Sequence, residues 1–193
     1  MRNLLRYTGT AMFFHWFIAL LIVVNVGLTW AVDDDAKATA TSRAIIDFHK
    51  STGLLILVLM LLRLVWRATH IPPALPATYK PWEVALTHAA HLGLYAVALA
   101  LPLTGWAHDE ARSVAVAAQY PLHVYGQFAW PHLGFIADLP PDVKQIWHKR
   151  LGHLHSLLAD VLYVLVGLHV LGALKHQWID KELELQRILP WGG

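Results

Sequence analysis

Two long stretches of this 193-residue chain contain no charged side chain, one between Arg6 and Asp33 and the other between Glu83 and Asp109. Each is longer than the ~20 apolar residues that a helix needs to cross the hydrocarbon core of a membrane. With 56% hydrophobic and 15% charged residues, the chain is too apolar for an ordinary soluble domain of its size. The sequence therefore predicts an integral membrane protein.

Two further apolar stretches complete a set of four. One is uncharged between Lys50 and Arg63, whose long side chains lie near its ends and reach the membrane interfaces. The other runs from Leu151 to Leu174 and contains a single acidic residue, Asp160. We expect one domain over residues 1–193, an all-α integral membrane four-helix bundle. Its predicted spans are residues 10–32, 48–67, 86–107 and 151–174.

An even number of spans places both termini on one side of the membrane. Of the 15 Lys and Arg residues, eight, among them Arg2 and Arg6, fall on the terminal side. The three consecutive acidic residues Asp33, Asp34 and Asp35 lie in one loop on the other side. Because the positive-inside rule counts basic residues, we predict cytoplasmic termini. The second outer loop, residues 108–150, is the longest.

Two histidines in the last span, His155 and His169, are fourteen residues apart. Along a helix this spacing is a rise of about 21 Å and a rotation that returns to within about 40° of the starting face. Each imidazole therefore lies on the same face at a different depth. The first two spans offer a partner for each, because His15 matches the inner depth of His169 and His49 matches the outer depth of His155.

Two pairs of imidazoles in an apolar bundle suggest two metal centres, and paired imidazoles in such a bundle hold haem. The chain has no cysteine, which excludes the covalent attachment of c-type haem and any cysteine-ligated cluster. We therefore expect two non-covalent, b-type haems. Because bis-histidine ligation leaves no open position, oxygen activation at the iron is not expected.

The chain has 13 histidines, and most are expected at interfaces or in loops. Periodicity leaves His91 open as an inner ligand, because it is nearly as deep as His15. For His88, at the end of a span, we expect an interfacial hydrogen-bonded role. A solvated role is the default for the histidines in loops and near loop ends, which are His70, His108, His123, His132 and His148.

Other side chains near the histidines have two interpretations each. Gly53, one turn after His49, leaves room for a flat macrocycle or provides a helix contact. Arg63 and Arg67, near the inner end of the second span, meet a haem propionate or anchor the span at the cytoplasmic surface. Asp160 lies about 140° from His155 around the helix and is expected to face away from the ligands.

Several motifs together resemble the bacterial cytochrome b561 family, which consists of small four-helix di-haem cytochromes of the inner membrane. The resemblance covers nearly the whole chain. The first motifs are Phe14-His15-Trp16, His49-Lys50-Ser51-Thr52-Gly53 and Arg63-Leu64-Val65-Trp66-Arg67. They are followed by Pro72-Pro73, Tyr79-Lys80-Pro81-Trp82, His88-Ala89-Ala90-His91 and Leu101-Pro102-Leu103-Thr104-Gly105. The last are His155 with His169 and the tail Leu174-Lys175-His176-Gln177-Trp178-Ile179-Asp180.

The resemblance implies that His15 with His169 and His49 with His155 ligate two b haems, while the third helix, which carries His91, supplies no ligand. It also implies a multi-pass protein of the bacterial inner membrane that transfers electrons and is coupled to the quinone pool, in its sharpest form from superoxide to ubiquinone. The chain departs from the family pattern in its long, aromatic loop from Tyr120 to Pro141. Histidines near the inner surface, His88 or His91, are candidates to supply the protons that quinone reduction needs.

Two alternatives remain open at this point. One is a membrane-anchor cytochrome subunit of a larger dehydrogenase or hydrogenase, and the other is a histidine-rich metal transporter without haem. The expected partners are membrane lipid, quinone, an unidentified outer electron donor or acceptor and a second copy of the chain in a homodimer. The net charge of +2 and the absence of a basic stripe argue against nucleic acid.

Overall fold

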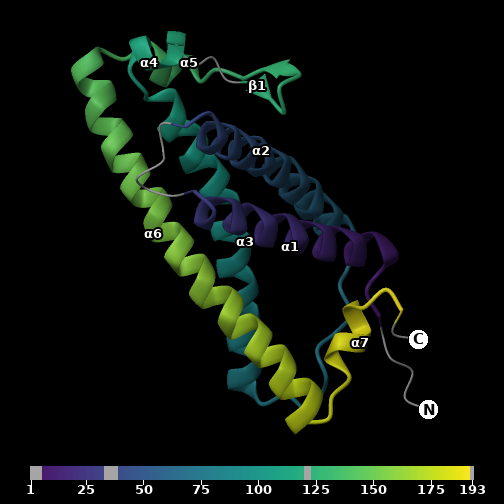
Figure 1. Cartoon of the computed structure of the whole chain (residues 1–193). Helices are drawn as coiled ribbons and strands as arrows, with labels where there is room; N and C mark the ends of the chain where they lie inside the picture. Colours follow the sequence, from purple (N-terminus) through teal and green to yellow (C-terminus); the bar gives the residue numbers. More distant parts are fainter. Residues whose placement is uncertain (1–5, 33–38, 120–122, 192–193) are drawn as a thin grey trace.

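Four long helices dominate the computed structural model, which describes residues 6–32, 39–119 and 123–191 (Figure 1). They are α1 (Gly9–Trp30), α2 (Ala40–Thr69), α3 (Pro81–Glu110) and α6 (Pro141–Leu174). All four are long and apolar enough to cross a membrane. The predicted helical bundle with four membrane spans is confirmed, whereas the cytoplasmic location of the termini stays a prediction. Arg2 and Asp33, Asp34 and Asp35, used for that prediction, lie outside the described residues.

The helices begin where the sequence supplies capping groups. The Thr8 hydroxyl accepts a hydrogen bond from the backbone N–H of Ala11, and Thr39 caps α2 in the same way. At the start of α3, Pro81 occupies the first turn and the Glu83 carboxylate accepts from the Lys80 N–H at 2.9 Å. As a result α2 and α3 begin eight and five residues before the predicted spans at 48 and 86, because caps and not hydropathy set their ends.

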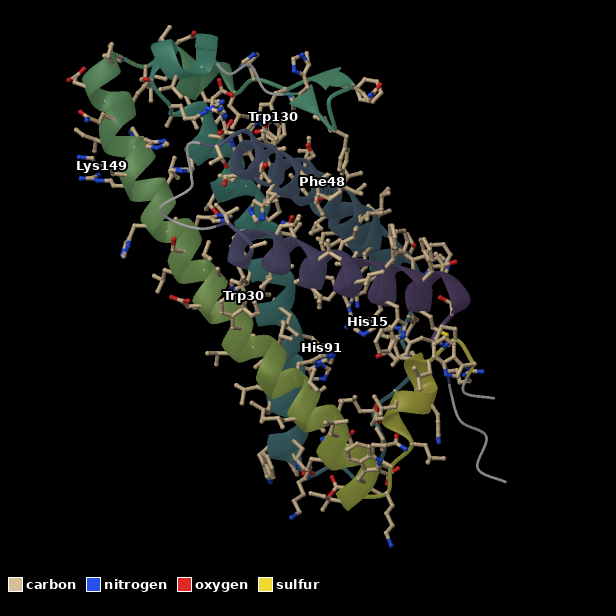
Figure 2. The ribbon with its side chains drawn as sticks, viewed as in Figure 1. His15, Trp30, Phe48, His91, Trp130 and Lys149 are labelled. Carbon is tan, nitrogen blue, oxygen red and sulfur yellow. The ribbon has the colours of Figure 1, made fainter. Side chains whose placement is uncertain are left out.

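The fourth helix corrects the predicted loop over residues 108–150. Helix α6 begins at Pro141, so its first ten residues, which include Lys149, are helical (Figure 2). Proline is suited to the first helical turn, and Asp142 in that turn complements the helix dipole. The charged side chains of residues 141–150 interrupt the apolar pattern but not the helix. Hydropathy therefore predicted only the apolar part of α6, residues 151–174.

Between α3 and α6 the chain forms small elements at one end of the bundle (Figure 1). They are α4 (Val114–Gln119), the antiparallel strands β1 (His123–Val124) and β2 (Phe128–Ala129), and α5 (Gly134–Ala137). At the hairpin turn, Tyr125 and Gly126 have φ of 51° and 70°, which the turn between such strands requires. Tyr125 fixes the hairpin on α2, because its N–H donates to Ser51 Oγ at 2.9 Å and its hydroxyl to Thr52 Oγ1 at 3.2 Å. We call this the hairpin end.

At the opposite end the chain turns back on the bundle. Helix α6 continues into a π-helical turn (Lys175–Ile179), followed by the short helix α7 (Glu184–Ile188). The Trp16 indole N–H donates to the carbonyl of Ile188 at 2.9 Å, and Arg6 Nη2 donates to that of Leu189 at 2.6 Å. Both ends of the described chain therefore lie at this end of the bundle, the α7 end, as four spans require.

The tightly packed interior is small. Ile18, Ile56, Met60 and Ala98 form a buried apolar cluster where α1, α2 and α3 meet. Large apolar side chains elsewhere are exposed, such as Leu92 on α3 and Val164 on α6, at 73% and 61%. Lipid covers such side chains in a membrane, so a spanning bundle keeps them outside.

Candidate functional site

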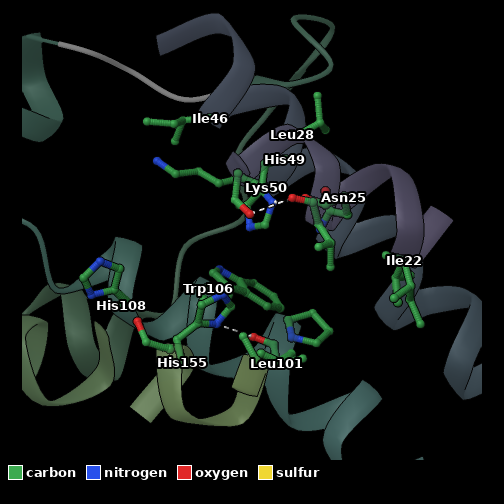
Figure 3. A pocket seen from close by; sticks show the side chains of 18 of the residues that line it. Ile22, Asn25, Leu28, Ile46, His49, Lys50, Leu101, Trp106, His108 and His155 are labelled. Carbon is green, nitrogen blue, oxygen red and sulfur yellow. Dashed lines mark hydrogen bonds between the residues drawn. The ribbon is translucent and has the colours of Figure 1, made fainter. Parts of the chain in front are cut away.

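At the hairpin end, His49 of α2 and His155 of α6 face one another (Figure 3). Their ring centres are 6.3 Å apart, and the ring planes are inclined by 84°. The Nδ1 of His49 donates to the carbonyl oxygen of Asn25 at 3.0 Å, and the Nδ1 of His155 donates to that of Leu101 at 3.0 Å. A carbonyl oxygen only accepts, so both rings carry their proton on Nδ1 and have a free lone pair on Nε2.

Three residues of α3 contact the His155 ring. Thr104 Oγ1 lies 3.2 Å from His155 Nδ1 and shares that proton with the carbonyl of Leu101. The same hydroxyl is 2.8 Å from the carbonyl of Ala100, to which it donates. Gly105 lies directly under the ring, since a Cβ there would be 3.1 Å from His155 Cε1. The Leu-Pro-Leu-Thr-Gly motif therefore orients one histidine of this pair.

A cavity of about 580 Å³ opens between these two histidines. This volume lies within the range of pockets that enclose small molecules and cofactors. Gly53, for which the sequence left room for a macrocycle and a helix contact both open, lines the cavity. Asp160, which was expected to face away from the ligands, lines it as well. Its deeper walls are apolar and include Ile22, Val26, Ile56, Ala98 and Leu162.

Charged side chains gather at the cavity on the hairpin side. Asp109, which is 5% exposed, binds Lys50 Nζ at 2.6 Å and Arg112 Nε at 2.9 Å. The nearby Trp130 is buried and lines the cavity (Figure 2). Within the described part of the chain, its indole N–H has no hydrogen-bond partner. The sequence placed Lys50 and Asp109 only at the ends of apolar stretches. It did not predict that they meet here with Arg112 and Trp130, because α2, the end of α3 and the segment after β2 are far apart in the sequence.

A second pair of histidines at this end corrects the expectation of solvated loop residues. His108 on α3 and His148 on α6 stack with ring centres 4.0 Å apart. Each Nδ1 is paired with the backbone carbonyl of the other residue, at 2.8 and 2.9 Å. Because α6 starts at Pro141, His148 lies on a helix beside α3 and not in a loop.

At the α7 end, the His15 ring of α1 is 6.3 Å from the His169 ring of α6, with an interplanar angle of 66°. His91 of α3 is also close, at 5.3 Å from His169, and its Nδ1 donates to the Thr87 carbonyl of its own helix at 2.7 Å. Figure 2 labels His15 and His91 near each other, in the half of the bundle toward α7. Three of the predicted histidines thus converge here, whereas His88 is exposed.

The two predicted arginines also lie at this inner group. Arg63 Nη2 is 3.2 Å from His15 Nδ1. The guanidinium groups of Arg63 and Arg67 lie over the Tyr95 ring at 5.2 and 5.9 Å from its centre. Within the described residues, neither arginine forms an ion pair with a carboxylate. The α7-end pair therefore has cations beside it.

Polar side chains close the α7 end at its surface. Lys175 binds both Glu83 and Asp180, and His176 Nδ1 is 2.7 Å from Asp180 Oδ2. The ammonium of Lys175 holds the pKa of the Asp180 carboxyl below its ordinary value. Tyr79 stacks on His176 with ring centres 4.2 Å apart, and burial raises the pKa of its hydroxyl. The lysine bridges the two carboxylates, so we interpret this cluster as a structural clasp between α3 and the tail.

The spacing of both facing pairs fits a metal between two imidazoles. A ligating nitrogen lies about 2 Å from its metal and the ring centre about 1.1 Å further, so two opposed rings have centres about 6.2 Å apart. His49 with His155 and His15 with His169 both have 6.3 Å. The His91 ring is closer to His169 than this spacing. Two pairs of imidazoles in apolar surroundings suit an iron porphyrin.

Several known proteins are similar to this chain over almost its whole length. A family model described as prokaryotic cytochrome b561 matches residues 6–191. Cytochrome b561 homolog 2 of Escherichia coli (strain K12) is 30% identical over 186 residues, 95% of this chain and 91% of that protein. Cytochrome b561 homolog 1 of the same organism is 24% identical over 185 residues, 96% and 97% of the two chains. A Yersinia pestis protein named "Probable superoxide oxidase CybB" is 27% identical over 187 residues, 96% of each.

The match extends through all four membrane helices, the elements between them and the tail. Because the family is one of b-type cytochromes, the predicted non-covalent haem, electron transport and multi-pass location in the bacterial inner membrane are confirmed at the level of the family. This chain belongs to the prokaryotic cytochrome b561 family.

Proposed function

We propose that this protein is a di-haem cytochrome that transfers electrons across the inner membrane between a donor at the hairpin end and quinone at the α7 end. The observation that carries the proposal is the equal 6.3 Å spacing of two separate histidine pairs, one toward each end of the bundle. A single pair would serve one haem. Two pairs at different depths serve transfer across the bilayer.

Four histidines would hold the two haems: His49 with His155, and His15 with His169. The Nδ1 hydrogen bonds of His49 and His155 orient their rings and direct Nε2 toward the partner. At the other pair, His15 is preferred to His91 because the His91 ring is too close to His169 to leave room for a metal between them. A b haem held by two imidazoles would supply one-electron transfer at each pair.

The cavity is the proposed haem pocket of the hairpin-end pair. Its apolar walls and Gly53 suit the macrocycle, while Lys50 and Arg112 provide positive charge for propionates. Arg63 and Arg67 are the corresponding cations at the other pair, which is one of the two interpretations that the sequence left open. All of these side chains come from the membrane helices or their immediate ends.

The proposed orientation has both termini and the α7 end in the cytoplasm. It is supported by the eight of 15 Lys and Arg residues that fall on the terminal side. The contacts of Arg6 and Trp16 with the tail hold both ends of the described chain at the α7 end. The hairpin end then faces outward. His49 and His155 form the outer pair, and His15 and His169 form the inner pair.

The sharpest form of the proposal is oxidation of superoxide coupled to reduction of ubiquinone. Two superoxide anions and one quinone, with two protons, give two molecules of oxygen and one quinol. The printed name of the Yersinia pestis relative supports superoxide as the donor. His88, exposed on α3, and His91, at the inner group, are the proposed proton donors on the quinone side.

A haem count on the purified protein tests this proposal. A pyridine haemochrome assay against quantified protein is expected to give two b haems for each chain, with the Soret and α bands of low-spin iron. One haem per chain, or a high-spin spectrum, would contradict the two-pair assignment. A protein without Soret absorption that binds other metals would instead favour a transporter, and a stoichiometric soluble partner after purification would favour an anchor subunit.

A further inference from the structure

The two histidine pairs differ in what their outer nitrogens contact. At the outer pair, His49 and His155 each donate from Nδ1 to a backbone carbonyl at 3.0 Å, and Thr104 Oγ1 adds a second acceptor beside His155. A hydrogen bond of this kind draws the ring proton toward the acceptor and increases the electron donation of the opposite nitrogen. The outer pair is therefore a strongly donating set of ligands.

The inner pair has a cation in place of such an acceptor. Arg63 Nη2 lies 3.2 Å from His15 Nδ1, and a guanidinium has donors only, so it cannot receive the ring proton. Among the described residues, none forms a hydrogen bond with the His169 ring. Arg67 adds a second positive charge over Tyr95. Neither ring of the inner pair has the carbonyl acceptor that both outer rings have.

Both differences make the reduction potential of the inner site higher than that of the outer site. Electron donation from the ligands stabilises the oxidised metal, and a nearby positive charge in a medium of low dielectric stabilises the reduced one. Strong donation at His49 and His155 lowers the potential of the outer site. The Arg63 charge lies at a ring nitrogen of His15 and raises the potential of the inner site, whereas the cations at the outer site, Lys50 and Arg112, are paired with Asp109.

We propose that Arg63 and Thr104 are positioning residues that make the inner site, at His15 and His169, more easily reduced than the outer site, at His49 and His155. The inference rests on the proposed function and adds a direction to it. Electrons then move downhill from a one-electron reductant at the hairpin end to a quinone acceptor at the α7 end. The reductant loses the electron that the inner site gains, and two such transfers with two protons complete one quinol.

A redox titration of the full-length protein, followed at the α band, tests the inference without any measurement of activity. We expect two couples in the unaltered protein. The higher couple should be lost in His15→Ala and the lower one in His155→Ala. Arg63→Gln should shift the higher couple negatively by about 59 mV or more, which corresponds to a tenfold change in the ratio of reduced to oxidised haem.

Opposite and conservative substitutions complete the test. Thr104→Val, which removes only the hydroxyl acceptor, should shift the lower couple positively, and Arg63→Lys, which keeps the charge, should retain the original higher couple. Arg150→Gln and Thr69→Val serve as controls, because Arg150 is exposed on α6 and Thr69 bonds to the Val65 carbonyl at the end of α2. Neither control should move a couple.

Several results would overturn the inference. They are a higher couple that belongs to the outer site, unchanged couples in Arg63→Gln and Thr104→Val, or shifts of the opposite sign. If Arg63→Gln loses haem, the order of the couples and the Thr104→Val shift decide the question. Two haems with the wrong order would overturn this inference alone, whereas a protein with one haem would overturn the proposed function itself.

Discussion

Gly105 of α3 and His155 of α6 are in such close contact that a Cβ on Gly105 would lie 3.1 Å from the imidazole Cε1. The helix backbone forms the floor under the ring, while Thr104 and the Leu101 carbonyl bind its Nδ1. His155 is therefore held on one face and at one nitrogen. Its Nε2 is left directed toward His49.

Gly105→Ala tests this contact. Overpacking of this kind typically costs about 1–3 kcal/mol, so the ring should move and haem at the outer pair should dissociate about 5- to 150-fold faster. Transfer of haem to an excess of apomyoglobin measures the rate. Gly167→Ala on α6 is the matched control, because a Cβ there meets nothing within 4 Å. Equal rates for both variants would show that Gly105 does not position His155.

Alanine substitutions of the four ligands should divide into two classes. His49→Ala and His155→Ala are expected to remove one haem, and His15→Ala and His169→Ala the other, because each pair forms one site. Haem counts and α-band spectra of the purified variants distinguish the classes. Loss of the inner haem in His91→Ala with retention in His15→Ala would show that His91 is the ligand.

The ion pairs of Asp109 should stabilise the hairpin end. Asp109→Asn removes the charge of a carboxylate that is 5% exposed, so the charges of Lys50 and Arg112 are less well compensated. We expect the free energy of unfolding to fall by about 1–3 kcal/mol. Both cations are partly exposed, which limits the loss. Thermal unfolding in detergent measures it. Asp142→Asn in the exposed first turn of α6 should change stability by less than about 1 kcal/mol.

The clasp at the α7 end should weaken in acid. Lys175 lowers the pKa of Asp180 in the folded protein. The ion pair therefore contributes fully to stability above the unfolded pKa of about 3.9, and this contribution is lost as the pH falls through the lower folded pKa. Limited proteolysis of the tail should therefore accelerate in this acid range. Asp180→Asn should give fast cleavage at neutral pH as well. A rate that is independent of both pH and this substitution would contradict the role of the clasp.

The membrane helices and the facing histidines could be predicted because their signals are periodic and local. Four apolar stretches, two of them free of charge, identified the four spans, and the spacing of His155 and His169 placed two imidazoles on one helix face. Helix ends could not be predicted from hydropathy, since Pro141 begins a helix whose first turns are polar.

The contacts of the histidines could not be predicted from the sequence, for a different reason. The groups that bind His49 and His155 are backbone carbonyls of Asn25 and Leu101, and every residue has such a carbonyl, so no residue type marks them. The Arg63 contact with His15 depends on how α1 and α2 cross. The stacking of His108 on His148 likewise depended on the true start of α6.

Transfer across the membrane by two separate sites is the central claim, and vesicles that contain His155→Ala protein test it most directly. The inner site should remain reducible by quinol, while exchange of electrons with an impermeant redox dye outside should be lost. His153→Ala, at an exposed position on the same helix, should behave like the unaltered protein. Undiminished exchange with the dye in a His155→Ala protein shown to lack the outer haem would contradict the claim.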